Sequence, residues 1–178
     1  MKVLHSFICT LLVTFACGSL AAQQNTAYLK AKVNPGRAGV FVDGKYLGPA
    51  ANFKVARKYA LPPGQHELKL IDPRYEEIAT TVSLNAGKTT VISETMKALP
   101  TAKGPFGELK TEYPDKFAAV YINDKFYGHS GEFDHAPQGL LLPPGSYSVR
   151  IESASGGSPV SKTVQVEVGK TVVVKSGA

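Results

Sequence analysis

Hydrophobic and polar residues alternate along much of this chain, in short runs separated by turn residues. Such alternation occupies residues 28–33, 66–70, 78–84 and 164–168. It places every second side chain on one face of an extended strand. Past residue 22 no segment keeps a helical period for long. The pattern therefore predicts an all-β protein whose short strands form antiparallel sandwiches.

The same pattern occurs twice. Residues 40–48 read VFVDGKYLG and residues 120–128 read VYINDKFYG, and each stretch is followed by a loop and then by the letters LPPG. The spacing between equivalent positions of the two copies increases only within loops, by a single position at a time. Drift confined to loops is typical of two copies of one fold. We therefore expect two small sandwich domains, at residues 27–98 and 106–178, joined by a linker at residues 99–105.

Turn residues stand at the same points in both copies. Asp43-Gly44 and Asn123-Asp124 each separate two apolar runs, which predicts type I′ hairpins with positive φ at both central residues. Pro63-Gly64 and Pro144-Gly145 predict type II turns, with proline in the second position of the turn and glycine in the third.

The phase of the alternation predicts which side chains are buried. In the first repeat these are Val40, Val42, Leu68, Leu70, Val82, Leu84 and Val91. In the second they are Val120, Ile122, Tyr147, Val149, Ile151, Val164, Val166 and Val172.

Residues 1–22 have the features of a signal peptide. Lys2 provides a positive start, residues 4–16 form an apolar run that is too short to span a bilayer, and residues 19–22 offer small residues for signal peptidase. We therefore expect an exported protein, whether periplasmic, secreted or on the cell surface. The alternative is a lipoprotein held on a membrane through Cys17. Because Cys9 also lies in this segment, we expect no disulfide in the mature chain.

Several residues of the first repeat carry a family resemblance. Pro35 and Ala38 precede the stretch VFVDGKYLG, LPPGQHELKL follows it, and Tyr75 and AGKTTV come after that. In this order they resemble the PEGA domain of bacterial envelope and surface proteins. The resemblance implies a small sandwich of the transthyretin or carboxypeptidase-regulatory type, and an accessory module without an activity of its own. Independently of the resemblance, no stretch past residue 22 approaches the length of a transmembrane helix.

The second repeat is similar to the same family in part. It matches through residues 120–128, 142–151 and 168–172, but residues 115–118 read DKFA where the family motif is expected, and residues 155–158 read SGGS in place of the aromatic turn. The resemblance implies two PEGA-like repeats in tandem, the second divergent, and provides no catalytic residues.

Charge is distributed unevenly along the chain, whose formal net charge is +6. Residues 27–98 carry 11 basic and 6 acidic side chains, whereas residues 104–178 carry 7 and 8. Lys54, Arg57 and Lys58 cluster in the loop before the first LPPG. This basic loop suits an anionic envelope polymer as its partner. The alternative is a solvated loop that serves solubility. Without a nucleic-acid-binding motif, nucleic acid is not an expected partner.

Histidine and acidic side chains give weak signals for chemistry. The alternation places His66 with the core residues of its strand, which favours a packing role. His129, Glu132, Asp134 and His135 share one loop, but their spacing is unlike that of structural zinc sites. No nucleophile elbow and no glycine-rich loop opening a helix is present. We therefore expect no metal, no cofactor and no catalytic residue, although distant residues could still assemble an active site.

Aromatic residues flank the predicted hairpin in both copies. They are Phe41, Tyr46 and Tyr59 in the first and Tyr121, Phe126 and Tyr127 in the second. If exposed, they would make a stacking platform for sugars or a patch for a partner; if buried, they would close the edge of a sandwich.

The leading functional hypothesis is an exported, non-catalytic tandem module that mediates binding or assembly at the bacterial cell envelope, through an envelope polymer or a protein partner. The alternative is a carbohydrate- or anionic-polymer-binding protein that uses the basic loop of the first repeat.

Overall fold

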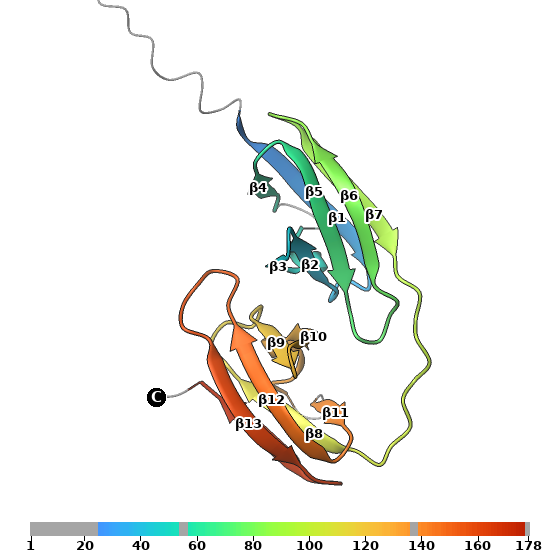
Figure 1. Ribbon diagram of the computed structural model, residues 1–178, viewed down its shortest axis with the longest axis vertical. Helices are drawn as coiled ribbons and strands as arrows, with labels where there is room; N and C mark the ends of the chain where they lie inside the picture. The colour runs from blue at the N-terminus through green and yellow to red at the C-terminus, as the bar shows by residue number, and fades with distance from the viewer. Residues whose placement is uncertain (1–24, 54–56, 136–138, 177–178) are drawn as a thin grey trace, which may run out of the picture.

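The computed structural model describes residues 25–53, 57–135 and 139–176. In this part of the chain the strands form two β-sandwiches placed end to end (Figure 1). The first contains β1 (Ala27–Asn34), β2 (Gly39–Val42), β3 (Lys45–Pro49), β4 (Tyr59–Leu61), β5 (Gly64–Ile71), β6 (Ile78–Leu84) and β7 (Thr89–Thr95). The second contains β8 (Gly107–Glu112), β9 (Ala119–Ile122), β10 (Lys125–His129), β11 (Leu140–Leu142), β12 (Gly145–Glu152), β13 (Val160–Val166) and β14 (Thr171–Lys175).

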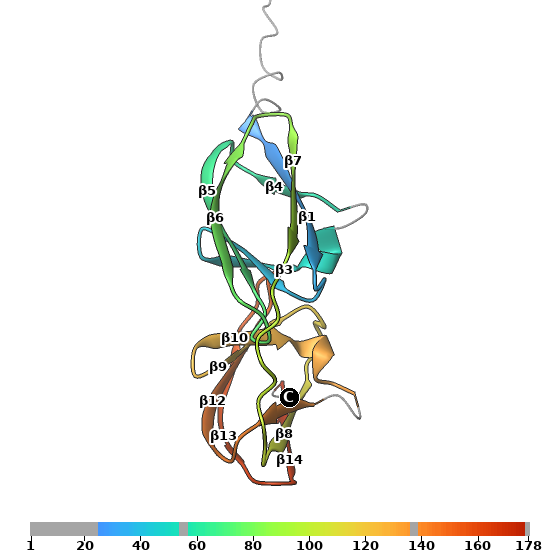
Figure 2. The same ribbon diagram turned by 90° about the vertical axis from the view of Figure 1, so that its right-hand side faces the viewer.

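Both sandwiches have the same strand order. In the first, the sheet β4-β1-β7 faces the sheet β3-β2-β5-β6; in the second, β11-β8-β14 faces β10-β9-β12-β13. Figure 2 shows the two layers of each sandwich nearly edge-on. The second repeat thus reproduces the topology of the first, strand for strand. The predicted fold class, all-β with two small sandwiches, is confirmed.

One strand pair in each sandwich departs from the antiparallel prediction. β1 runs parallel to β7, and β8 runs parallel to β14, while every other pair among the described strands is antiparallel. Parallel neighbours need a long crossover between them. The first and last strands of each repeat satisfy this condition, because the other five strands of the repeat lie between them in sequence.

Each sandwich has its own core between its sheets. Leu68 and Leu70 are fully buried in the first, as Val149 and Ile151 are in the second. These residues come from β5 and β12, the central strands whose alternation is clearest in the sequence.

Val91 corrects the predicted core, since its side chain is 48% exposed. Its neighbour Ile92 packs against the first core instead. Both residues are apolar and adjacent, so the sequence of β7 does not reveal which one points inward. Val173 stands at the equivalent position of β14 and is also exposed.

The tips of the two hairpins have left-handed backbone. In the first hairpin φ is 51° at Asp43 and 76° at Gly44; in the second it is 48° at Asn123 and 62° at Asp124. A type I′ turn needs positive φ at both central residues, and its twist matches that of the flanking strands.

The two Pro-Gly pairs differ from the type II turns expected of them. φ is 138° at Gly64 and 159° at Gly145, well beyond the roughly 80° of that turn. The physical reason is that each glycine is already the first residue of a strand. Gly64 pairs with Leu84, and Gly145 pairs with Val166.

Two short 3₁₀ helices, η2 (Ala50–Phe53) and η3 (Ser130–Glu132), follow the third strand of each repeat. Within the described ranges, no helix has the length and apolarity needed to cross a lipid bilayer. The expected signal peptide, with Cys9 and Cys17, lies outside the described residues, and so does Lys54.

Candidate functional site

The two sandwiches meet through the same hairpin of each repeat, β2–β3 in the first and β9–β10 in the second (Figure 1). Phe41, Tyr46 and Phe126 are each only 7% exposed at this contact. The ring centroid of Phe126 lies 5.3 Å from that of Phe41 and 5.4 Å from that of Tyr46. Aromatic pairs of this kind add about 0.5–1.5 kcal/mol each beyond their apolar burial. We call this contact, with the polar network described next, the junction.

The junction gives the hairpin aromatics a role that neither sequence hypothesis contained. Phe41, Tyr46 and Phe126 are no stacking platform, and they pack across two sandwiches instead of closing the edge of one. The remaining three are half-buried: Tyr121 beside Phe126, Tyr59 against the first core and Tyr127 against the second.

Gly39 makes room for this packing. A Cβ atom at residue 39 would lie 2.7 Å from two ring carbons of Phe126, which is closer than carbon atoms approach without repulsion. The second repeat has Ala119 at the equivalent place. The first hairpin thus carries its smallest residue where the ring of the second sandwich docks.

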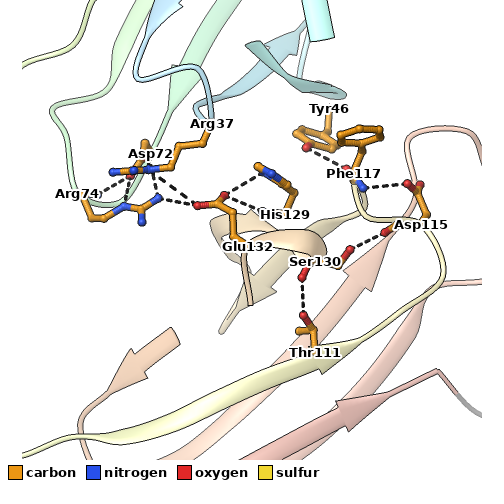
Figure 3. A network of polar contacts seen from close by, with 10 residues as sticks. All are labelled: Arg37, Tyr46, Asp72, Arg74, Thr111, Asp115, Phe117, His129, Ser130 and Glu132. Carbon is orange, nitrogen blue, oxygen red and sulfur yellow. Dashed lines mark hydrogen bonds and ion pairs between the residues drawn. The ribbon is translucent and has the colours of Figure 1, made fainter. Parts of the chain in front are cut away.

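A hydrogen bond crosses the junction beside the aromatic rings (Figure 3). The hydroxyl of Tyr46 donates to the backbone carbonyl of Phe117 over 3.1 Å. Burial raises the pKa of Tyr46 far above its ordinary value, with smaller contributions from Tyr121 and Glu132. The phenol therefore stays neutral, as a donor must.

An ion cluster stands on the other side of the junction. Asp72 is 2% exposed and accepts hydrogen bonds from Nε of Arg74 at 2.8 Å and from Nε of Arg37 at 2.9 Å. Nη2 of Arg74 reaches the second carboxylate oxygen at 3.0 Å. Burial raises the pKa of Asp72, but the hydrogen bonds from Arg74 and Arg37 outweigh it and hold the pKa below its ordinary value. The fold thus buries a charged carboxylate and pairs it twice.

Glu132 connects this cluster to the second sandwich (Figure 3). Nη2 of Arg74 donates to Oε2 of Glu132 at 2.9 Å, across the junction. Nδ1 of His129 lies 2.9 Å from Oε1 of the same carboxylate. Burial raises the pKa of Glu132, whereas His129 and Arg74 lower it by more. The side chain of Glu132 is 14% exposed and the side chain of Arg74 is 47% exposed, so water reaches this ion pair from the side of Arg74.

Arg37, Asp72 and Arg74 are not among the site residues that the sequence predicts, although the sequence contains a signal for two of them. In the register of the sheets, Asp72 and Arg74 occupy the places of Ser153 and Ser155 in the second repeat. A charged residue in only one of two copies is not required by the shared fold, and therefore points to a role of that copy alone.

A hollow of about 550 Å³ opens beside the junction, between β2–β3 and the loop after β12. Its lining includes Phe41, Tyr46, Tyr121, Arg150, Ser153 and Ser155. The guanidinium of Arg150 lies 4.0 Å from the ring centroid of Tyr121. The carboxylate of Glu152 meets the charge of Arg150, and Lys45 adds a further positive charge to the lining.

The predicted basic loop is only partly described. Arg57 and Lys58 are exposed, and both line a shallow groove of about 390 Å³ with Phe53 and Tyr59. Nζ of Lys58 lies 3.6 Å from the ring centroid of Tyr28 on β1. The structure thus associates Lys58 with a strand of the first sandwich.

The acidic and histidine residues of the second repeat are divided between two places. His129 and Glu132 belong to the junction, while Asp134 is paired with Lys116 and His135. Among the residues described, no three His, Cys, Asp or Glu side chains gather as metal ligands would.

His66 fastens the first hairpin to β5. Its side chain is 9% exposed, with Nδ1 lying 2.6 Å from Oδ2 of Asp43 and Nε2 lying 2.9 Å from the carbonyl of Pro62. The other oxygen of Asp43 accepts the backbone N–H of Glu67 at 2.9 Å. In the second repeat, Asn123 accepts from the N–H of Ser148 and Tyr147 donates to the carbonyl of Pro143. The contact is therefore structural in both repeats.

Comparison with known proteins supports the resemblance of the first repeat to the PEGA domain. The family model of the PEGA domain matches residues 28–99. No curated protein gives a significant match to the chain. A solved structure, the Bacillus anthracis TIE protein, is similar with 15% sequence identity and a TM-score of 0.31, covering 85% of this chain and 33% of that one. The chain thus spans about a third of the length of that structure. Residues 28–99, which contain nearly all of the first sandwich, are a PEGA domain.

Proposed function

We propose that this PEGA-domain protein is a non-catalytic module that mediates binding or assembly at the bacterial cell envelope after export. In this proposal the two sandwiches act as one rigid body. The observation that carries it is the junction, where buried aromatic rings and the Arg74–Glu132 ion pair join the repeats. A rigid pair of sandwiches presents a long surface to a partner without the entropic cost of ordering it on binding.

The polar side chains with catalytic potential support the non-catalytic part of this proposal. His66 is held between Asp43 and Pro62, and the hydroxyl of Ser130 donates to the carbonyl of Asp115. Thr111 donates in turn to the carbonyl of Ser130 at 2.8 Å. Hydroxyl groups that hold buried carbonyls in this way stabilise the fold. Among the described residues, neither Ser130 nor Thr111 donates to a base as a nucleophile does.

Fractionation of the native cell followed by chemical crosslinking tests the proposal. We expect the protein in the envelope fractions, with crosslinks to one or a few envelope components. Intact-mass measurement of the same fraction should give an unmodified N-terminus near Ala22 or Gln23; a lipidated Cys17 would instead place the protein on a membrane. Recovery of the full chain from the cytoplasm, without crosslinked partners, would refute the proposal.

A further inference from the structure

The outer face of the sheet β4-β1-β7 carries a row of lysines beside a row of hydroxyl groups. Residues of β1 alternate between buried and outward positions, and the parallel register sets the outward positions of β7 beside them. The outward residues of β1 are Tyr28, Lys30, Lys32 and Asn34, and those opposite on β7 are Thr89, Val91, Ser93 and Thr95. We call this surface, together with Lys58, the lysine face.

Lys58 joins the face from the side of β4, which pairs with β1 through Tyr28 and Ala60. Its ammonium lies over the ring of Tyr28 at 3.6 Å, a cation–π contact that orients the side chain along the sheet. Lys32 is exposed and forms no ion pair with any residue that the structure describes. None of the outward residues of β1 and β7 is acidic.

The second sandwich shows that the fold does not require this charge. On its equivalent face Glu108 and Glu112 stand where the first repeat has Tyr28 and Lys32. Nζ of Lys110 lies 3.6 Å from Oε2 of Glu108, and Nζ of Lys175 lies 2.8 Å from Oε2 of Glu112. The outward residues of this sheet therefore include glutamates in the second repeat and no acidic residue in the first.

We propose that the lysine face binds an acidic polysaccharide of the envelope, an inference that rests on the proposed function and names its ligand. Lys30 and Lys32 are separated by about 6.6–6.8 Å along the strand, and the ammonium groups can pair with carboxylates along one chain. The adjoining Thr89 and Ser93 are placed to hydrogen-bond sugar hydroxyls. A linear polymer fits a flat row of charges.

A membrane surface fits this face less well. Peripheral membrane binding uses large apolar side chains that enter the lipid, and Val91 is the one large exposed hydrophobic residue among the outward residues described on β1 and β7. The hydroxyl row on β7 offers groups that a sugar chain uses and a lipid tail does not.

Calorimetric titration of the full chain with alginate, a linear polyuronate, tests the inference. The double variant Lys32→Ala, Lys58→Ala should bind about tenfold more weakly, because two exposed ion pairs with the polymer are lost. The control Lys110→Ala, Lys175→Ala removes the same charge from the second sandwich and should bind as the wild type does. Binding should weaken with salt, as the Debye length falls from about 10 Å at 0.1 M to about 3 Å at 1 M.

Four results would overturn the inference. Equal loss in both double variants would mean that net charge alone attracts the polymer. Equal binding of neutral dextran would remove the role of the lysines, and binding to mixed vesicles of phosphatidylglycerol and phosphatidylcholine but not to alginate would identify a membrane surface. Absence of alginate binding would also refute it, while retention in the envelope fractions would leave the proposed function standing. Melting curves of each variant show whether it remains folded.

Discussion

At the scale of single residues, the two repeats hold the same hairpin in place with different side chains. Asp43 and His66 hold the first hairpin against β5, where Asn123 and Tyr147 hold the second against β12. Of these four residues, only His66 has an ordinary pKa near neutral pH. The hydrogen bond with Asp43 raises the pKa of His66 and, in return, lowers that of Asp43, because each group favours the charged form of the other.

This difference predicts that pH affects the stability of the hairpin contact in the first repeat and not that of its counterpart in the second. A raised pKa means that the contribution of His66 is fully present below about pH 6.5 and is lost as pH rises through its folded pKa. The contribution of Asp43 is lost as pH falls through its own lowered pKa. His66→Tyr, which installs the residue of the second repeat, should therefore flatten the melting temperature between pH 6 and 9. If the melting temperatures of wild type and variant changed with pH in the same way across this range, His66 would not be the source of the pH dependence.

The residues that set the hairpin could be predicted from sequence, whereas the phase of β7 could not. Asp43 and Gly44 are among the few residues that accept positive φ, so their position indicates the turn directly. Val91 and Ile92 are both apolar and β-branched, and only the packing of β7 shows that Ile92 faces the core.

Gly44 offers a direct test of the turn. A Cβ at this residue would meet no atom within 4 Å, and its φ is 76°, so any cost of substitution comes from the backbone. Gly44→Val should lower the free energy of unfolding by about 1–3 kcal/mol, and Gly44→Asn by clearly less, since Asp124 already occupies the equivalent place at a φ of 62°. Urea denaturation measures both. Equal effects of Val and Asn would show that backbone strain does not govern this position.

At the scale of elements, alternation and turns identify most strands, but neither reveals which strands become neighbours. Lys30 and Lys32 are far from Lys58 in sequence. The distribution of charge along the sequence therefore indicated only the loop that contains Lys58, and not the two lysines of β1. Pairing of β4 and β7 on either side of β1 brings these lysines and the hydroxyl row to one face. A charged surface built from separated strands is visible only once the sheet order is known.

At the scale of the whole molecule, the junction turns two repeats into one unit. Each repeat has a separate core, and a third cluster joins them through Phe41, Tyr46 and Phe126. Sequence could place these aromatics on the hairpins but not show what covers them, because alternation identifies a face and not its partner. The junction uses residues that differ between the two copies, namely Gly39, Asp72 and Arg74.

The distance between the two sandwiches in solution tests this account most directly. Double electron–electron resonance measures that distance between spin labels at Lys88→Cys and Lys162→Cys, both of which are exposed positions. Cys9 and Cys17 are changed to Ser for this purpose. We expect one narrow distribution, which should broaden in Phe126→Ala, Glu132→Ala and stay narrow in the control Val173→Ala. A broad distribution in the wild type, or no change on removing the junction, would contradict the claim that the two sandwiches form one rigid body.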